Sequence, residues 1–314
     1  MSFSGEVKEE LSKQLSTARH CQIAELSAII LFCGKIVQGE QGKISLEVRT
    51  ENSSVIRKYF TLLKKTFNIN TDISEKMIGF EKNGGSIVIE ICNQEEVTKI
   101  LSAVKFMDVK GNLVLEREWI NPILLNNSCC RRAFLRGIYL AIGSMSDPEK
   151  SYHLEFVCMK EMQAKKLCNV LNDFGLEAKI VIRKKYYVVY VKEGSCIVDF
   201  LNIIEAHVSL MDLENLRILK EMRNSINRRV NCETANITKT VTASSKHLDD
   251  IEIIRDQYGL INLPQNLREA AEVRLEYPDA TLKELGEYLT PPVGKSGVNH
   301  RLRKLSELAD RIKR

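Results

Sequence analysis

The pattern of apolar and polar residues in the first two thirds of the chain occurs twice. A largely apolar nine-residue segment at 26–34 matches a second one at 135–143, an offset of 109 residues. Three further pairs of segments follow in the same order at similar offsets: 44–48 with 152–156, 67–73 with 174–180, and 87–91 with 187–191. Because self-similarity at a nearly fixed offset indicates a repeated structural unit, we predict two copies of one fold.

Each copy is predicted to contain, in order, a helix, a strand, a helix, two strands and a helix. The strands alternate apolar and polar residues, as Ile44, Leu46 and Val48 do, which is typical of strands with one buried face. Helices near 54–67 and 159–174 carry apolar residues at helical spacing and would cover that face. The other face of each sheet would be left open. The first copy differs by a longer hairpin, expected at residues 75–85.

These elements predict an α+β domain over residues 1–210, with repeats at about 1–120 and 121–210 related by a pseudo-two-fold axis. A connecting helix is expected at 211–232. The polar, threonine-rich segment 232–245 has little apolar periodicity and is interpreted as a linker or a helix start. Residues 233–314 are predicted to form a separate all-α domain.

Short helices with clear boundaries are predicted in the last 50 residues. Pro264 suits a first helical turn, and a helix starting there would end before Pro278. Thr281 and Glu284 have the spacing of a capping box, which starts a second helix. After a break at 290–295, Ser296 is expected to cap a third helix that ends near residue 312. This order predicts a helix-turn-helix, although the break is longer than the tight turn of that motif.

The third helix has one apolar side and one polar side. Val298, Leu302, Leu305 and Ala309 fall on one side at 100° per residue. The predicted DNA-binding residues lie on the other side and at the N-terminal end: Lys295, Ser296, Asn299, His300, Arg301, Arg303 and Lys304. We expect the arginines and Lys304 to contact phosphates or guanine, and Asn299 and His300 to read bases. The alternative is a small helical domain with a solvated outer face.

Charge placement favours a polyanionic partner for this helix. Residues 295–314 carry seven basic and two acidic residues, a net charge of +5 that equals the net charge of the whole chain. A basic C-terminal helix favours double-stranded DNA as the partner. A solvated, frayed tail is the other interpretation of such a charge run.

Composition excludes several classes of protein. Hydrophobic residues make up 44% and charged residues 28% of the chain, close to globular averages. No apolar stretch reaches the ~20 residues needed to cross a bilayer. The first ten residues are acidic and lack an apolar core, unlike a signal peptide. We therefore expect a cytoplasmic protein rather than a membrane or secreted one.

The cysteines and histidines give no familiar site. The nine cysteines contain no C-x-x-C, and adjacent Cys129 and Cys130 suit neither a normal disulfide nor two tetrahedral ligands. His20 and His207 lack partners at a catalytic spacing. There is no glycine-rich phosphate loop and no Ser-His-Asp order to support catalysis. We expect free thiols, no metal and no cofactor.

Four large residues of the first domain are assigned structural roles. Trp119 is expected to be a packing anchor between the two repeats, as buried aromatic residues usually are. Arg131, Arg132 and Arg136 are expected to cap a helix or pair with acids at the domain edge rather than contact nucleic acid.

The paired nine-residue segments resemble the LAGLIDADG helices of homing endonucleases. Leu135, Gly137, Ala141 and Gly143 match that pattern in the second copy, and Leu26 and Gly34 match it in the first. The resemblance implies that the two helices pack across the pseudo-two-fold axis of a saddle-shaped domain. It also implies a metal-binding acid at the eighth position, but the residues there are Cys33 and Ile142. Without carboxylates to hold Mg²⁺, the family's hydrolytic mechanism is not expected.

Three stretches over the whole chain resemble the WhiA family of bacterial sporulation and cell-division regulators. They are residues 3–11, residues 129–137 with 143–155, and residues 295–305. The resemblance implies a non-catalytic, sequence-specific transcriptional regulator of Gram-positive bacteria, linked to cell division, chromosome segregation and sporulation. It implies that the helix-turn-helix does most of the DNA binding and that the protein is associated with the nucleoid.

Two alternatives remain. The first is a protein-interaction scaffold, in which the open sheet face binds a regulatory protein such as a sigma factor or another transcription factor. That face would show a mixed set of charges: Glu47, Arg49, Glu90, His153, Glu155, Lys179, Arg183 and Tyr190. It lacks the positive excess of a DNA groove, although Arg49, Lys179 and Arg183 could retain a DNA contact. The second alternative is an active nuclease with a relocated metal site at Asp147 or Glu149.

Overall fold

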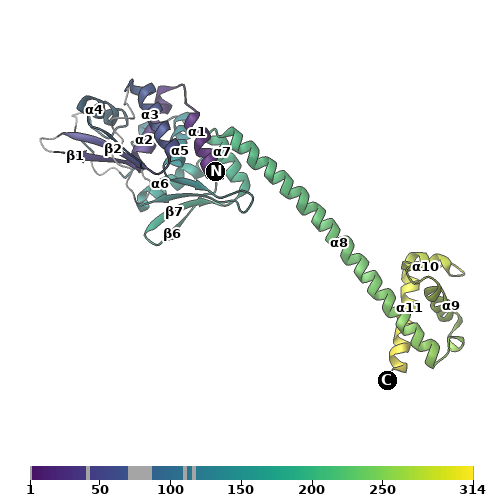
Figure 1. The fold of residues 1–314 in the computed structure, drawn as a ribbon. Helices are drawn as coiled ribbons and strands as arrows, with labels where there is room; N and C mark the ends of the chain where they lie inside the picture. Colours follow the sequence, from purple (N-terminus) through teal and green to yellow (C-terminus); the bar gives the residue numbers. More distant parts are fainter. Residues whose placement is uncertain (1, 40–42, 70–86, 109–111, 115–117, 314) are drawn as a thin grey trace. The chain divides into compact units, whose positions relative to one another are not determined.

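The computed structural model describes residues 2–39, 43–69, 87–108, 112–114 and 118–313. The chain divides into two compact units, Met1–Leu219 and Lys220–Arg314. Each has its own hydrophobic core, so each is described by itself (Figure 1). No helix within the described parts of the chain combines the length and apolar character needed to cross a membrane.

The first unit begins with α1 (Phe3–Lys13) and continues with the first of the two copies. This copy consists of α2 (Arg19–Cys33), β1 (Gly34–Gln38), β2 (Ile44–Thr50), α3 (Ser53–Phe67), β3 (Ile87–Ile91) and α4 (Gln94–Ala103). The strands form an antiparallel sheet in the order β1-β2-β3. The hairpin expected at 75–85 lies outside the described residues, as does most of the repeated segment 67–73.

The second copy repeats this order, with one more strand between its second and third helices among the described residues. After η2 (Pro122–Leu125), it consists of α5 (Ser128–Ile142), β4 (Gly143–Met145), β5 (Leu154–Cys158), α6 (Glu161–Asn172), β6 (Lys179–Arg183), β7 (Tyr186–Val191) and α7 (Gly194–Ile203). Its antiparallel sheet has the order β4-β5-β7-β6. The predicted α+β class with two repeats is confirmed.

Strands β1 and β4, which directly follow the first helix of each copy, were not predicted. The chain passes from helix to strand at Gly34 and Gly143, whose backbones are extended. At Gly143 a Cβ atom would lie 2.5 Å from Cδ2 of Tyr139. No polar turn marks this change, and β4 has only three residues, too few for alternation to be visible in the sequence.

Helices α2 and α5 pack side by side and join the two copies (Figure 1). At their contact, a Cβ atom on Gly137 would collide with the carbonyl oxygen of Glu25 and lie 2.7 Å from Cβ of Ala28. The ring of Trp119 meets Phe32 of α2 at 6.5 Å and Phe134 of α5 at 5.3 Å, both edge to face. Trp119 is therefore the predicted anchor between the repeats.

A buried ionic network holds the helices around this pair. Glu25 Oε1 lies 2.9 Å from Lys58 Nζ and 3.1 Å from Arg136 Nε, and the side chains of all three residues are at most 1% exposed. Arg136 also donates to Glu205 Oε2 at 2.7 Å and to Ser16 Oγ at 2.7 Å. The expectation that Arg136 lies at the domain edge is wrong. An arginine can be buried here because acceptors from three other segments, at Glu25, Ser16 and 204–205, surround its guanidinium group.

The other two arginines of α5 lie nearer the surface. Arg131 donates to the Leu125 carbonyl at 3.0 Å and lies 3.7 Å from Asp173. Its pairing with an acid matches the prediction. Arg132 is exposed.

The second unit is entirely helical in the described residues. It contains the end of α8 (His207–Gln257), η3 (Leu260–Asn262), α9 (Gln265–Glu276), α10 (Leu282–Tyr288) and α11 (Lys295–Ile312). Its core joins Ile251 and Ile254 of α8 with apolar side chains of the last three helices. Pro264 precedes α9, and the capping box of Thr281 and Glu284 begins α10, as predicted.

The interpretation of 232–245 as a linker or helix start is corrected, because the segment lies within α8. No glycine or proline occurs between residues 207 and 257, so nothing in this stretch breaks a helix. Apolar periodicity is absent because the segment is almost wholly exposed and buries no stripe.

Substitution of Gly137 tests the close approach of α2 and α5. Gly137→Ala is expected to destabilise the first unit by roughly 1–3 kcal/mol, because the new methyl group would overlap the α2 backbone. Urea unfolding followed by the fluorescence of Trp119, the single tryptophan, measures this change. Gly194→Ala is the control, because its Cβ would have no neighbour closer than 3.4 Å. Equal unfolding midpoints for Gly137→Ala and the unchanged protein would contradict the proposed contact.

Candidate nucleic-acid interface

The packing of α11 divides its side chains into a buried set and an exposed set. Val298, Leu302, Leu305 and Ala309 are at most 1% exposed in the core of the second unit. Six of the seven predicted DNA-binding residues are exposed: Lys295, Ser296, Asn299, His300, Arg303 and Lys304. The structure therefore brings the predicted set to one surface of one helix.

The seventh residue, Arg301, is half-buried. Its guanidinium donates to the backbone carbonyl of Asn266 on α9 at 3.3 Å. This bond fixes the direction of the side chain and leaves part of it at the surface.

The N-terminus of α11 differs from the prediction. The helix begins at Lys295, with Gly294 as its N-cap, and no side chain caps it. Ser296 lies inside the first turn, so the expectation that it caps the helix is wrong. Glycine at an N-cap leaves the first backbone amides without a side-chain acceptor. These amides are available to another acceptor, as at helix termini that bind anions.

Arg303 has a partner within its own helix. Its Nε lies 3.0 Å from Glu307 Oε1, and the two side chains are 77% and 52% exposed. The hydrogen bond from Arg303 lowers the pKa of Glu307. An exposed i,i+4 pair of this kind contributes little to stability, so a phosphate can compete for the guanidinium.

A basic cavity of about 540 Å³ lies next to this face. It takes Lys295 and Asn299 from α11, and its other ionisable lining residues are Lys239, His247, Arg274 and Lys283. None of the described residues that line it is acidic. A cavity of this charge suits an anionic group.

Two buried nitrogen atoms in the lining residues have no partner among the described residues: Nε of Arg274 and Nδ1 of His247. Arg274 is 2% exposed, and its Nη1 donates to the Ala280 carbonyl at 2.8 Å. Burial lowers the pKa of His247, and the positive charge of Arg274 lowers it further. Unpartnered buried nitrogens are costly unless a ligand or water satisfies them.

Sequence reasoning missed the lining residues outside α11. Lys239 lies in the segment interpreted as a linker, and Arg274 lies on the helix predicted to end before Pro278. The basic residues are spread over α8, α9 and α10, so their spacing in the sequence gives no signal.

The ends of α2 and α5 where the nuclease family carries its acids have a different chemistry here. Cys33 and Ile142 are the last residues of the two helices. Cys33 lines a cavity of about 900 Å³ together with Lys8. Burial lowers the pKa of Lys8 to about 8 and raises that of Cys33 to about 11. At neutral pH this pair is therefore a cation and a neutral thiol, which disfavours a divalent metal.

Two acids that could serve as metal ligands are already engaged. Glu9, in the same cavity, pairs with Arg57 at 2.7 Å and accepts from Ser54 Oγ at 2.7 Å. Asp147 accepts from the backbone amide of Glu149 at 2.9 Å within a turn. The structure thus gives Asp147 a turn-forming contact, and among the described residues Asp147 is not part of a potential metal-binding group.

The charged sheet face of the first unit is largely neutralised by its own residues. Glu155 Oε2 lies 2.9 Å from Arg183 and 3.1 Å from His153, and Arg49 lies 3.5 Å from Glu47. Because these cations already face carboxylates, they are poorly placed to neutralise phosphates.

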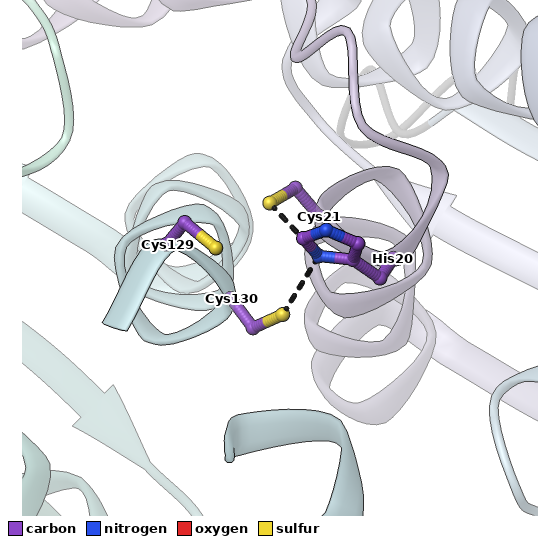
Figure 2. Close-up of side chains that lie close together, drawn as sticks. All are labelled: His20, Cys21, Cys129 and Cys130. Atoms are coloured by element: carbon purple, nitrogen blue, oxygen red, sulfur yellow. Dashed lines mark hydrogen bonds between the residues drawn. The ribbon is translucent and has the colours of Figure 1, made fainter. Parts of the chain in front are cut away.

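One group of side chains contradicts the expectation that His20 has no partner. His20 and Cys21 on α2 meet Cys129 and Cys130 on α5 (Figure 2). Among the described residues, this is the group whose donor atoms could together hold a metal ion. The pairs are 109 residues apart, so sequence spacing gave no indication of their contact.

Comparison with known proteins agrees with this architecture. Three family models match: the WhiA N-terminal LAGLIDADG-like domain at 19–107, the WhiA LAGLIDADG-like domain at 131–223 and the WhiA C-terminal HTH domain at 226–309. The exposed face of α11 lies within the last of these matches.

Full-length relatives and a solved structure extend the match over the whole chain. The chain is 54% identical to the probable cell division protein WhiA of Lachnoclostridium phytofermentans, and the match covers 100% of both chains. It is 48% identical to that of Alkaliphilus oremlandii, over 99% of this chain and 98% of the relative. The crystal structure of full-length DUF199/WhiA from Thermatoga maritima matches with a TM-score of 0.61 and 26% identity over 99% of each chain. The chain therefore belongs to the WhiA family, in which LAGLIDADG-like domains precede a C-terminal helix-turn-helix domain.

Proposed function

We propose that the protein is a non-catalytic, sequence-specific regulator that binds double-stranded DNA through α11. The observation that carries this proposal is the exposed polar face of α11 beside a basic cavity with no acidic lining residue. Both lie in the unit that matches the family's HTH model. In a helix-turn-helix, the N-terminal part of the last helix contacts base edges in the major groove.

The exposed residues divide by chemistry into two groups. Asn299 and His300, near the start of α11, can exchange hydrogen bonds with base edges. Arg301, Arg303 and Lys304 supply positive charge for phosphates or guanine. Arg303 would give up its exposed ion pair with Glu307 and bind a phosphate instead.

The basic cavity would receive a backbone phosphate. Lys283 and Lys295 would neutralise its charge, while the unpartnered nitrogens of Arg274 and His247 offer hydrogen-bond donors. A phosphate held beside the first turn of α11 would set the depth of that helix in the groove, because phosphate contacts fix register and orientation.

The role in the cell follows from the relatives, which are named probable cell division proteins. We propose that DNA binding regulates transcription of genes for cell division, chromosome segregation and, where it occurs, sporulation. The protein would act on the nucleoid in the cytoplasm, with a sigma factor or another transcription factor as its protein partner.

Absence of catalysis is part of the proposal. Cys33 and Ile142 replace the acids of the nuclease pattern, and Lys8 places a cation beside Cys33. A site with this charge does not hold Mg²⁺ for phosphodiester hydrolysis.

Removing positive charge from α11 tests the DNA-binding proposal. The triple variant Arg301→Ala, Arg303→Ala and Lys304→Ala is expected to lose retardation of sheared chromosomal DNA in a gel, because it lacks three phosphate or base contacts. If all three residues contact phosphates, the slope of log affinity against log salt should fall by about three. The same gel, run with Mg²⁺, should show no new fragments.

The matched control removes three exposed charges from the first unit: Lys64→Ala, Lys65→Ala and Lys166→Ala. Its retardation should be close to that of the unchanged protein. Equal losses of DNA retardation in both triple variants would show that the effect depends on net charge alone, and would contradict a specific interface on α11. Cutting by the unchanged protein would contradict the non-catalytic assignment.

Lys283 tests the phosphate in the cavity separately. Lys283→Gln is expected to weaken binding to all DNA sequences by a similar factor and to lower the salt slope by about one, as for a phosphate contact. Fluorescence anisotropy with two unrelated duplexes at several salt concentrations measures both quantities. Lys246→Gln, an exposed residue of the same unit outside the cavity lining, is the control. An unchanged slope for Lys283→Gln would remove the cavity from the interface.

A further inference from the structure

The four side chains at the start of α2 and α5 occupy equivalent positions in the two repeats. His20 and Cys21 are the second and third residues of α2, and Cys129 and Cys130 are the second and third residues of α5. His20 corresponds to Cys129, and Cys21 corresponds to Cys130, at the offset of 109 residues that relates the repeats. Packing of α2 on α5 therefore brings the two dipeptides together (Figure 2).

The distances between the donor atoms suit a small tetrahedral ion. One donor atom from each residue lies within 4.8 Å of all the others. His20 Nδ1 is 3.1 Å from Cys130 Sγ and 3.3 Å from Cys21 Sγ. Bonds of about 2.3 Å to sulfur and about 2.0 Å to nitrogen place the ligands of tetrahedral Zn²⁺ about 3.5–3.8 Å apart. Small side-chain rotations would therefore bring the four atoms to this geometry.

The four side chains form a site that an ion could reach from solvent and that is partly buried. Cys21 and Cys130 are 5% and 4% exposed, whereas His20 and Cys129 are exposed. The two buried sulfur atoms would face the core, and the other two ligands would close the site from the surface. This arrangement lets an ion enter without opening the domain.

The electrostatic surroundings favour negative charge at the cluster. Three thiolates with one Zn²⁺ and a neutral imidazole carry one net negative charge. Neither helix has an acidic residue in its first turn, and neither Ala18 nor Asn127 caps its helix with a side chain. The positive ends of both helix dipoles therefore lie at the site, where they stabilise thiolates.

We propose that His20, Cys21, Cys129 and Cys130 bind one Zn²⁺ ion that links the N-terminal ends of α2 and α5. Each thiol would release its proton to solvent as its S–Zn bond forms, and His20 would bind through Nδ1 with its proton on Nε2. No oxidant or reductant takes part.

This site is separate from the positions of the former nuclease acids. Cys33 follows Cys21 by twelve positions along α2, which corresponds to about 18 Å along a helix. A metal at the opposite end would thus act as a structural crosslink between the repeats and not as a catalyst. Three soft thiolate ligands also select a thiophilic ion over Mg²⁺.

Metal binding by the full-length chain tests the proposal directly. Protein reduced and stripped with a chelator is titrated with Zn²⁺ in competition with a chromophoric chelator, and metal content is measured by mass spectrometry. We expect one Zn²⁺ per chain, with a higher unfolding temperature of the first unit reported by Trp119. Co²⁺ should give the intense visible absorption of a tetrahedral thiolate site.

Single substitutions at the exposed ligands keep the test independent of folding. Cys129→Ser and His20→Ala change exposed side chains and are expected to weaken Zn²⁺ binding at least a hundredfold while circular dichroism stays unchanged. Cys232→Ser, which alters an exposed cysteine of α8, is the matched control and should bind as the unchanged protein does.

Two results would overturn the proposal. The first is a folded, reduced protein that takes up no Zn²⁺ or binds it equally well after Cys129→Ser. The second is a protein without metal affinity whose mass is lower by two hydrogen atoms and whose Cys21 is joined to Cys129 or Cys130, which would make the cluster a disulfide-forming pair.

Discussion

The contact between α2 and α5 is the constraint on which the first unit depends. Gly137 lets the backbones approach so closely that a single methyl group would overlap the carbonyl of Glu25. The same Glu25 receives Lys58 and Arg136 in a buried network, so the packing and the charge pairing share one residue. Removal of one member would leave a buried charge uncompensated, which is far more costly than loss of a surface pair. Close backbone packing and buried ion pairs therefore hold the two repeats together at the same residue, Glu25.

Around this contact, the chain has the fold of a LAGLIDADG domain but lacks the carboxylates of the nuclease pattern. A neutral thiol beside Lys8 stands where the nuclease pattern needs a carboxylate. On the sheet face, Arg183 and Arg49 face carboxylates, whereas the basic cavity beside α11 has no acidic lining residue. Unpaired positive charge is what phosphate binding requires. The distribution of charge thus favours the helical unit, rather than the sheets, as the nucleic-acid interface.

Both ends of the α2–α5 pair carry residues at equivalent positions of the two repeats. Cys33 and Ile142 stand at equivalent C-terminal positions of α2 and α5, and neither can act as a metal-binding acid. At the opposite ends, His20 and Cys129 are equivalent, as are Cys21 and Cys130. The pseudo-two-fold axis concentrates these four side chains because the helices cross it as a pair. The packing of the two repeats thereby brings side chains 109 positions apart in the sequence beside one another.

The sequence by itself determined the features that are local or periodic. The α10 capping box, the apolar stripe of α11 and the polar face opposite it follow from residues a few positions apart, where backbone geometry fixes their relation. The two repeats follow from the recurrence of one local pattern at an offset of about 109 residues. Only the tertiary structure decided the burial of Arg136, the basic cavity and the cluster at His20. Each of these joins residues from different elements, up to 120 positions apart for Ser16 and Arg136. The sequence determined helix α8 only in part. The absence of glycine and proline permits a continuous helix, but the exposed segment 232–245 has no apolar pattern that would indicate it. Local patterns specify elements, whereas contacts between distant residues depend on how those elements pack.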